Sequence, residues 1–263
     1  MSLDEATDLV KQQTLTRDAF LGGRLTVSQP EKGFRAGLDS VLLGAAVNPA
    51  ARSLLDLGAG VGTAALVAMA ELPQLETTLV EADPAMVALS AHNALANGMA
   101  GRTRVLALDL TAPGKARASA GLAADHFSAV IANPPFFDPA RGSAPSKARA
   151  GARHMEEGGL DAWVKTAATH AAPGGEVIFI HVAEVLPQLL AAFTRRFGAV
   201  SVLPLLPLLP REGEPASRVL VRGIKGSRAP FVLLGARVLH EAVGRGFRPE
   251  FDAIFRGTAR LIW

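Results

Sequence analysis

The tetrad Asn133-Pro134-Pro135-Phe136 follows an apolar run, and its residue types point most directly to chemistry. Two adjacent prolines fix φ and carry no N–H, so the carbonyls beside Asn133 are rigid acceptors without a competing donor. An amide oxygen and a neighbouring carbonyl that converge can accept both hydrogens of an NH2 group, while an aromatic ring covers the planar molecule that carries it. The alternative is that Asn-Pro-Pro only ends a strand and turns the chain.

A second motif, DLGAGVG at residues 56–62, joins an apolar run to an alanine-rich helical stretch. Glycines at such a turn permit positive φ and let a ligand approach the backbone at a helix N-terminus. A dinucleotide site has the spacing G-x-G-x-x-G and binds a pyrophosphate, whereas this chain reads G-x-G-x-G with Asp56 two residues ahead. A carboxylate there favours a cofactor with a cationic amino acid end. A glycine loop that binds nothing is the alternative.

Acidic residues follow the next two strand-like runs. Glu81 lies about 20 residues past the glycines, where a carboxylate can accept bonds from two ribose hydroxyls, and Asp109 can accept from an adenine amino group. Asp83-Pro84 also fits an ordinary helix start. Because the carboxyl ends of parallel strands meet at one crevice, the four motifs predict one shared site.

The series DLGAGVG, VEAD (80–83), LDL (108–110) and NPPF (133–136) resembles class I S-adenosylmethionine-dependent methyltransferases of the branch that methylates NH2 groups. With residues 33–44 and the run 218–226, nearly the whole chain is similar to the bacterial tRNA1(Val) (adenine-N6)-methyltransferases. Many members carry tyrosine after the two prolines. This chain has Phe136 and no tyrosine at all, which preserves stacking but not a hydroxyl contact. Phenylalanine there also occurs in bacterial guanine-N2 methyltransferases of ribosomal RNA, so both bases stay open.

The resemblance implies a Rossmann-like α/β fold with a mainly parallel seven-stranded sheet, a late antiparallel strand and helices on both faces. It also implies S-adenosyl-L-methionine as cofactor and an RNA substrate, tRNA first, methylated at adenine N6 in the anticodon loop. The expected catalytic residues are Asn133, Pro134, Pro135 and Phe136. The expected cofactor-binding residues are Asp39, Asp56, Gly58, Gly60, Gly62, Glu81, Asp109, Leu110 and Asn133.

Other functions remain as alternatives. A protein glutamine N5-methyltransferase uses the same Asn-Pro-Pro acceptors, but that family has a sizeable helical domain ahead of the glycine motif, which residues 1–50 barely accommodate. A small-molecule O-methyltransferase has no need of the Asn-Pro-Pro acceptors. A non-enzymatic RNA-binding module predicts decayed motifs, whereas all four are intact here.

Composition excludes several classes of chemistry. The absence of cysteine excludes disulfides, thiol nucleophiles and cysteine-based zinc sites. The six histidines have no metal-binding spacing, and no serine lies in a G-x-S-x-G elbow, so we expect neither a metal site nor a hydrolase triad. An acidic N-terminus and the lack of a long apolar run predict no signal peptide and no membrane span. We expect a cytoplasmic protein and leave its oligomeric state open.

Basic residues are concentrated in two regions, although the formal net charge is only +3. The stretch 141–154 contains four cations and no acid, and residues 211–263 carry ten Lys or Arg against five acids. Such asymmetry is typical of a surface that faces a polyanion. The predicted RNA-binding residues are therefore Arg141, Lys147, Arg149 and Arg153. The alternative is a solvated loop whose cations serve solubility.

Two regions are expected along the chain, within one structural domain overall. Residues 1–50 form an N-terminal extension that packs on the cofactor site, in which 20–27 and 33–36 pair as strands and Asp39 caps a helix that ends at Ala46. Residues 51–263 form the methyltransferase domain, whose tail from Phe231 packs on the sheet edge.

Alternating strands and helices are expected within the second region. Trp163 is expected in the core, and a helix is expected to start at Pro249. The expected strands are 53–57, 77–81, 103–108, 127–132, 175–182, 199–203 and 217–224, and the expected helices are 62–72, 84–97, 159–171 and 183–197.

Overall fold

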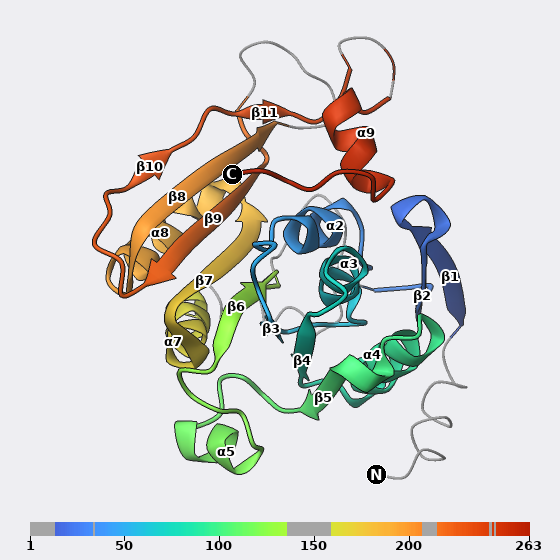
Figure 1. Cartoon of the computed structure of the whole chain (residues 1–263), viewed down its shortest axis with the longest axis horizontal. Coiled ribbons are helices and arrows are strands. Elements are labelled where there is room, and N and C mark those ends of the chain that lie inside the picture. The colour runs from blue at the N-terminus through green and yellow to red at the C-terminus, as the bar shows by residue number, and fades with distance from the viewer. Residues whose placement is uncertain (1–13, 34, 136–158, 207–214, 242–243, 245) are drawn as a thin grey trace.

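The computed structural model describes residues 14–33, 35–135, 159–206, 215–241, 244 and 246–263. A single large sheet runs through the molecule, with strands in the order β10-β8-β9-β7-β6-β3-β4-β5 and β11 also paired with β8 (Figure 1). The strands are β3 Ser53–Leu57, β4 Glu76–Glu81, β5 Thr103–Ala107, β6 Phe127–Ala132, β7 Ala171–Val182, β8 Phe197–Leu206, β9 Arg218–Lys225, β10 Val232–Leu233 and β11 Arg237–Val238.

Seven of these strands, β3 to β9, form the Rossmann-like sheet that the sequence predicts. Strands β3 to β7 pair in parallel, and β9 runs antiparallel between β7 and β8. The strand order reverses at β3, whose neighbours are β4 and β6. In open α/β sheets ligands bind at the carboxyl ends of the strands beside such a switch point. The two-residue strands β10 and β11 extend the predicted sheet.

Helices cover both faces of the sheet because successive strand side chains point to opposite sides. Leu54 and Ile131 belong to one core cluster with α2, α3, α4 and α9, whereas Leu55 and Val130 belong to a second cluster with α7 and α8. The helices are α2 Leu38–Ala45, α3 Thr63–Glu71, α4 Pro84–Ala96, α5 Gly114–Ser119, α7 Leu160–His170, α8 Leu186–Thr194 and α9 Pro249–Phe255. The predicted two-face arrangement and the helix start at Pro249 are confirmed, while α5 was not expected.

The N-terminal part differs from the sequence prediction. An antiparallel hairpin pairs β1 Leu15–Phe20 with β2 Leu25–Pro30 across a short 3-10 helix. In that turn Gly22 and Gly23 have φ values of 65° and 93°, which favour glycine. The expected pairing of 20–27 with 33–36 is therefore wrong, because these glycines reverse the chain inside the first expected strand.

The start of α2 also differs from the prediction. Gly37 is the N-cap residue and Asp39 lies inside the first turn, so the expected capping role of Asp39 is wrong. The helix nevertheless packs against α3 in the same core cluster as Leu25 of the hairpin. The division of the chain at residue 50 stays a prediction. No helix in the described part of the chain combines the length and apolarity needed to cross a bilayer.

Candidate active site

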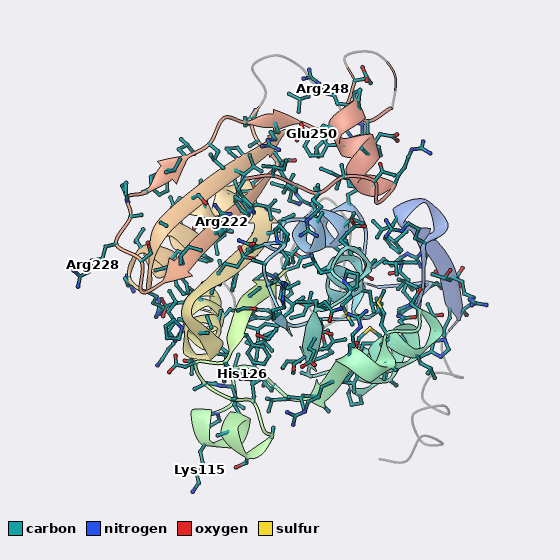
Figure 2. All side chains as sticks on the ribbon, in the orientation of Figure 1. Lys115, His126, Arg222, Arg228, Arg248 and Glu250 are labelled. Atoms are coloured by element: carbon teal, nitrogen blue, oxygen red, sulfur yellow. The ribbon has the colours of Figure 1, made fainter. Side chains whose placement is uncertain are left out.

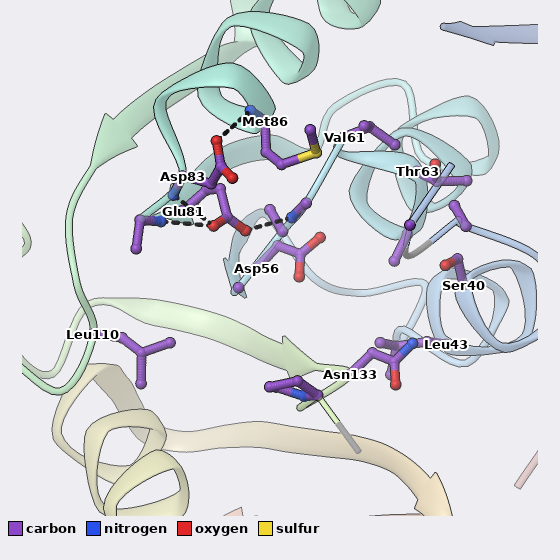
Figure 3. A pocket seen from close by; sticks show the side chains of 18 of the residues that line it. Ser40, Leu43, Asp56, Val61, Thr63, Glu81, Asp83, Met86, Leu110 and Asn133 are labelled. Atoms are coloured by element: carbon purple, nitrogen blue, oxygen red, sulfur yellow. Dashed lines mark hydrogen bonds between the residues drawn. The ribbon is translucent and has the colours of Figure 1, made fainter. Parts of the chain in front are cut away.

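A cavity of about 490 Å³ lies at the carboxyl ends of β3 and β4, within the size range of small-ligand and cofactor sites (Figure 3). Its wall combines the segment that leads into α2, the glycine turn after β3, the end of β4 and the residues after β5. Asn133, which follows β6, and Trp163 of α7 complete it. The predicted motifs thus reach one cavity from several elements.

Asp56 is the buried carboxyl of this cavity. It is 2% exposed and is the second-last residue of β3, and its side chain points into the space between Glu81 and Asn133 (Figure 3). Its Oδ2 has no hydrogen-bond partner among the described residues. Burial raises the pKa of Asp56 to about 8, the Ala65 backbone N–H opposes this rise, and the Glu81 carboxylate adds to it. A buried acceptor left unpaired beside a cavity suits a donor from a ligand.

The three glycines of the turn, Gly58, Gly60 and Gly62, have φ values of 65°, 55° and 86°. Their surroundings differ. A Cβ on Gly58 would clash with the ring of Trp163, and one on Gly60 would meet open space. Gly62 is the left-handed N-cap of α3 and is not among the residues that line the cavity. The turn is therefore held close to Trp163 while its middle glycine leaves the cavity open.

Glu81 connects the end of β4 with the glycine turn. Its carboxylate accepts backbone N–H bonds from Gly60 at 2.9 Å, Ala82 at 2.7 Å and Asp83 at 2.9 Å (Figure 3). Since a carboxylate has roughly four lone-pair sites, about one site remains for a ligand donor. The backbone bonds fix the carboxylate before any ligand binds.

Asp109 and Leu110 line the cavity after β5. Asp109 is exposed, and its Oδ1 accepts from the Thr111 N–H at 2.8 Å and the Thr111 hydroxyl at 2.7 Å. Leu110 is buried and belongs to the core cluster of α7. The pair supplies a fixed acceptor beside an apolar surface.

Asn133 and Pro135 line the cavity, whereas Pro134 is buried and does not. The register pairs Ala132 with Leu57, so the Asn-Pro-Pro segment emerges directly beside the glycine turn. The predicted site residues Phe136, Arg141, Lys147, Arg149 and Arg153 lie outside the described residues.

Asp39, like Gly62, is a predicted cofactor residue that does not line the cavity. The Asp39 Oδ2 accepts a bond from Arg218 Nε at 2.9 Å. The first turn of α2 directs this carboxylate to the start of β9, while the next residue, Ser40, lines the cavity. Of α2, it is Ser40 and Leu43 that reach the site.

Sequence reasoning missed several wall residues. Trp163 is a core residue, as predicted, at 7% exposed, yet it also lines the cavity beneath Gly58. Thr63, at the start of α3, has a buried hydroxyl without a partner in the described residues. Trp163 carries no local signal, because it reaches the cavity only through packing, whereas Thr63 directly follows the glycine motif. Gly33, Ala36, Ser40 and Leu43 were also missed, although they belong to the stretch 33–44. Pro30, Lys32, Ala64, Met86 and Thr111 line the cavity without belonging to any of the motifs.

The charge of the wall tests which cofactor fits. Four acids line the cavity, Asp56, Glu81, Asp83 and Asp109, and Lys32 is the sole basic residue among the described lining residues. Such a wall favours a ligand with net positive charge and disfavours a pyrophosphate. S-adenosylmethionine carries a sulfonium and an ammonium against one carboxylate, so the residues present fit it.

A Rossmann-like sheet with this acidic cavity at its switch point defines a class I S-adenosylmethionine-dependent methyltransferase. The chain belongs to the methyltransferase small domain family, whose model matches residues 37–203. A solved structure described as a predicted O-methyltransferase from Agrobacterium tumefaciens is 31% identical, with a TM-score of 0.71 over 85% of this chain and 98% of that one.

Curated relatives are named tRNA1(Val) (adenine(37)-N6)-methyltransferase. The protein from Flavobacteriaceae bacterium (strain 3519-10) is 31% identical over 135 residues, which is 51% of this chain and 53% of that protein. The protein from Shewanella amazonensis is 35% identical over 145 residues, or 54% and 58%. The alignments thus span about half the length of these relatives.

Proposed function

We propose that this protein methylates the N6 amino group of an adenine in the anticodon loop of a tRNA. The observation that carries the proposal is that Asn133 lines the same cavity as Asp56 and Glu81. An acceptor for an NH2 group therefore lies beside the groups suited to a cationic cofactor. The names of the curated relatives support adenine in tRNA as the target.

The cofactor is assigned to the acidic side of the cavity. Asp56 would accept from the ammonium group, Glu81 from a ribose hydroxyl, and Asp109 from the adenine amino group of the cofactor. Leu110 would pack against its adenine ring. When bound, S-adenosylmethionine supplies an activated methyl group on a sulfonium sulfur.

Asn133 is assigned to orient the acceptor base. The amino group of adenine is a weak nucleophile because its lone pair is delocalised into the ring, so positioning must supply most of the acceleration. The Asn133 amide oxygen, at the cavity, would accept one of its two hydrogens, which favours a pyramidal nitrogen with its lone pair exposed. Acceptance of the second hydrogen by the Pro134 carbonyl stays a prediction, because Pro134 does not line the cavity. Stacking of Phe136 on that base stays a prediction.

Contact with RNA phosphates is proposed for Arg141, Lys147, Arg149 and Arg153. Three cations of the C-terminal region instead have partners within the protein. Arg218 pairs with Asp39 and Lys225 with Asp125, and the Arg222 guanidinium lies 4.5 Å from the centre of the Trp263 ring. Because of these internal contacts, the four cations of residues 141–153 are the first candidates for contact with RNA phosphates. Arg228, by contrast, is exposed and projects from the edge of the molecule (Figure 2).

Salt dependence of RNA binding tests the four loop cations. Replacing all four with Gln is expected to flatten the salt dependence by up to about 0.7 to 0.9 log units per lost phosphate contact. Cofactor affinity should stay unchanged. Arg228→Gln is the single-site control at an exposed cation outside residues 141–153. An unchanged RNA affinity and salt slope in the quadruple variant would assign the four cations to solubility.

Nucleoside analysis tests the reaction itself. The purified protein is incubated with methyl-labelled S-adenosylmethionine and either unmodified tRNA or unmodified ribosomal RNA, and the digested nucleosides are separated by mass spectrometry. N6-methyladenosine from tRNA, absent with Asn133→Ala, is the expected result. N2-methylguanosine from ribosomal RNA would overturn the adenine assignment in favour of the guanine alternative.

Oxygen methylation is the other arm of this test, because the Agrobacterium structure is described as a predicted O-methyltransferase. A panel of small phenols and carboxylic acids replaces RNA in parallel reactions. Methyl transfer to these oxygens with none to either RNA would reject the proposal.

A further inference from the structure

The N-terminal hairpin is attached to the methyltransferase fold by two asparagines four residues apart, Asn93 in α4 and Asn97 at its C-cap. Asn97 accepts from the Thr26 N–H at 3.0 Å and donates to the Thr26 carbonyl at 2.8 Å. Asn93 accepts from the Ser28 N–H at 2.8 Å and donates to the Ser28 carbonyl at 2.9 Å. Strand β1 pairs with one edge of β2 and leaves the other edge open. On that open edge the two amides bond the N–H and C=O groups of Thr26 and Ser28, as a neighbouring strand would do.

Asn93 makes one contact that Asn97 does not. Its Nδ2 also donates to the carbonyl of Val61, at 3.0 Å, within the glycine turn that lines the cavity. Asn97 instead donates to the Asn93 carbonyl of its own helix at 2.7 Å. Asn93 is fully buried, so water cannot replace either partner without opening the structure. A single amide therefore holds both the hairpin and the glycine turn.

The hairpin also continues into another part of the cavity wall. Pro30 ends β2 and lines the cavity, followed by Lys32, Gly33 and Ala36. This segment is fixed by the hairpin itself, because the Gln29 side chain accepts from the Ala36 N–H at 2.9 Å and Arg35 pairs with Asp18 at 2.6 Å. A shift of the hairpin would consequently move both this part of the cavity wall and the Asn93 amide that holds the Val61 carbonyl.

We propose that Asn93 is a positioning residue that couples docking of the N-terminal hairpin on α4 to binding of S-adenosylmethionine. The inference rests on the assignment of the cavity to this cofactor and does not depend on which RNA is methylated. Coupling between two sites is reciprocal. Cofactor binding must therefore stabilise the docked hairpin by the same factor by which docking strengthens cofactor binding.

Calorimetry on a matched pair of variants tests the coupling. Asn93→Ala and Asn97→Ala both remove an amide that holds the hairpin, but only the first loses the contact with Val61. We expect Asn93→Ala to weaken S-adenosylmethionine binding about tenfold, the scale of one buried hydrogen bond, and Asn97→Ala to change it by less than about threefold. Equal affinities in both variants, or an equal loss in both, would overturn the proposal.

Hydrogen exchange provides a second test, which can be made on the parent protein without any variant. Saturating cofactor is expected to slow exchange in the segment 25–30 of the parent as well as in the turn 58–62. Asn93→Ala should keep the protection of the turn and lose that of the hairpin, while Asn97→Ala keeps both. Protection confined to the turn in the parent would overturn the coupling even if Asn93→Ala fails to fold.

Failure of the coupling can be distinguished from failure of the cavity assignment. If the parent binds S-adenosylmethionine with an affinity that Glu81→Ala does not change, the cofactor lies elsewhere and the cavity assignment fails. If Glu81→Ala weakens binding while Asn93→Ala does not, only the coupling fails.

Discussion

Two buried carboxylates on the central sheet have opposite surroundings. Asp56 on β3 is 2% exposed and Glu176 on β7 is 4% exposed, so both are deeply buried. Glu176 accepts the Asn48 N–H at 2.6 Å, and Arg222 and Arg260 lie close enough to oppose the rise that burial causes in its pKa. Asp56 has an unpartnered Oδ2, and the charged neighbour that acts on its pKa is another acid, Glu81.

The difference separates a structural acid from one suited to a ligand. Glu176 is level with Leu54 in the strand register and binds the loop that enters β3, whereas Asp56 opens into the cavity at the carboxyl end. Arg222 lies on β9 beside the C-terminal segment, where its guanidinium covers the Trp263 ring (Figure 2). Since buried acids are tolerated when paired, Glu176 is satisfied within the protein, whereas Asp56 keeps an unpartnered oxygen at the cavity.

Asn133→Ala has the largest expected effect. It tests whether Asn133, at the carboxyl end of β6, contributes to the rate of methyl transfer. Loss of one hydrogen bond made in the transition state is expected to lower the single-turnover rate by about 100-fold or more. Cofactor affinity should stay within a few-fold by calorimetry, because Asn133 is assigned to the acceptor base. A near-normal rate would make Asn133 only a turn residue at the end of β6.

Glu176→Ala tests the structural acid. It removes the acceptor of the Asn48 N–H bond and the carboxylate that acts on the half-buried Arg222, so the free energy of unfolding should fall by about 2 to 3 kcal/mol. Denaturant unfolding measures the loss. Affinity for S-adenosylmethionine should not change, and a variant that unfolds normally but binds cofactor poorly would reverse the roles of the two carboxylates.

Glu81→Ala tests the ligand side of the comparison directly. The variant loses a fixed acceptor and releases three backbone N–H groups, so cofactor binding should weaken by about 1 to 3 kcal/mol. Glu76→Ala, at the exposed start of the same strand, is the control and should bind as the parent does. Calorimetric titration of both variants with S-adenosylmethionine makes the comparison; equal affinities would remove Glu81 from the site.

Asp56→Asn has the smallest expected effect, a change in pH dependence. The pKa of Asp56 is raised from 3.8 to about 8 in the folded protein, so the folded state binds this proton more tightly than the unfolded state. Stability without cofactor must therefore fall as pH rises from about 4 to about 8. Relative to Asp56→Asn, the parent should lose about 1 kcal/mol of unfolding free energy between pH 6 and pH 7. Parallel profiles in denaturant unfolding would contradict a raised pKa.

The sequence predicted the central sheet well and the N-terminal region poorly. Strands β3 and β6 have the expected bounds, β4 and β5 differ by one residue at one end, and β9 differs by one residue at each end. Such strands combine apolar runs with clear turn signals, so local pattern determines them. The hairpin was misplaced because two glycines that look like part of a strand provide its turn. Its position is fixed by contacts with Asn93 of α4 and with the C-cap residue Asn97.

By itself, the sequence determined the chemical types at the carboxyl ends of four strands and, through their order, the cofactor class. Tertiary structure decided which residues share the cavity: it turned Asp39 towards Arg218, brought Trp163 beneath Gly58 and joined Ser28 to Val61 through Asn93. The physical reason is range. A strand end is specified by neighbours a few residues away, whereas these contacts join residues 30 or more positions apart, as between Asn93 and Val61 at a separation of 32, and only burial of the whole core fixes them.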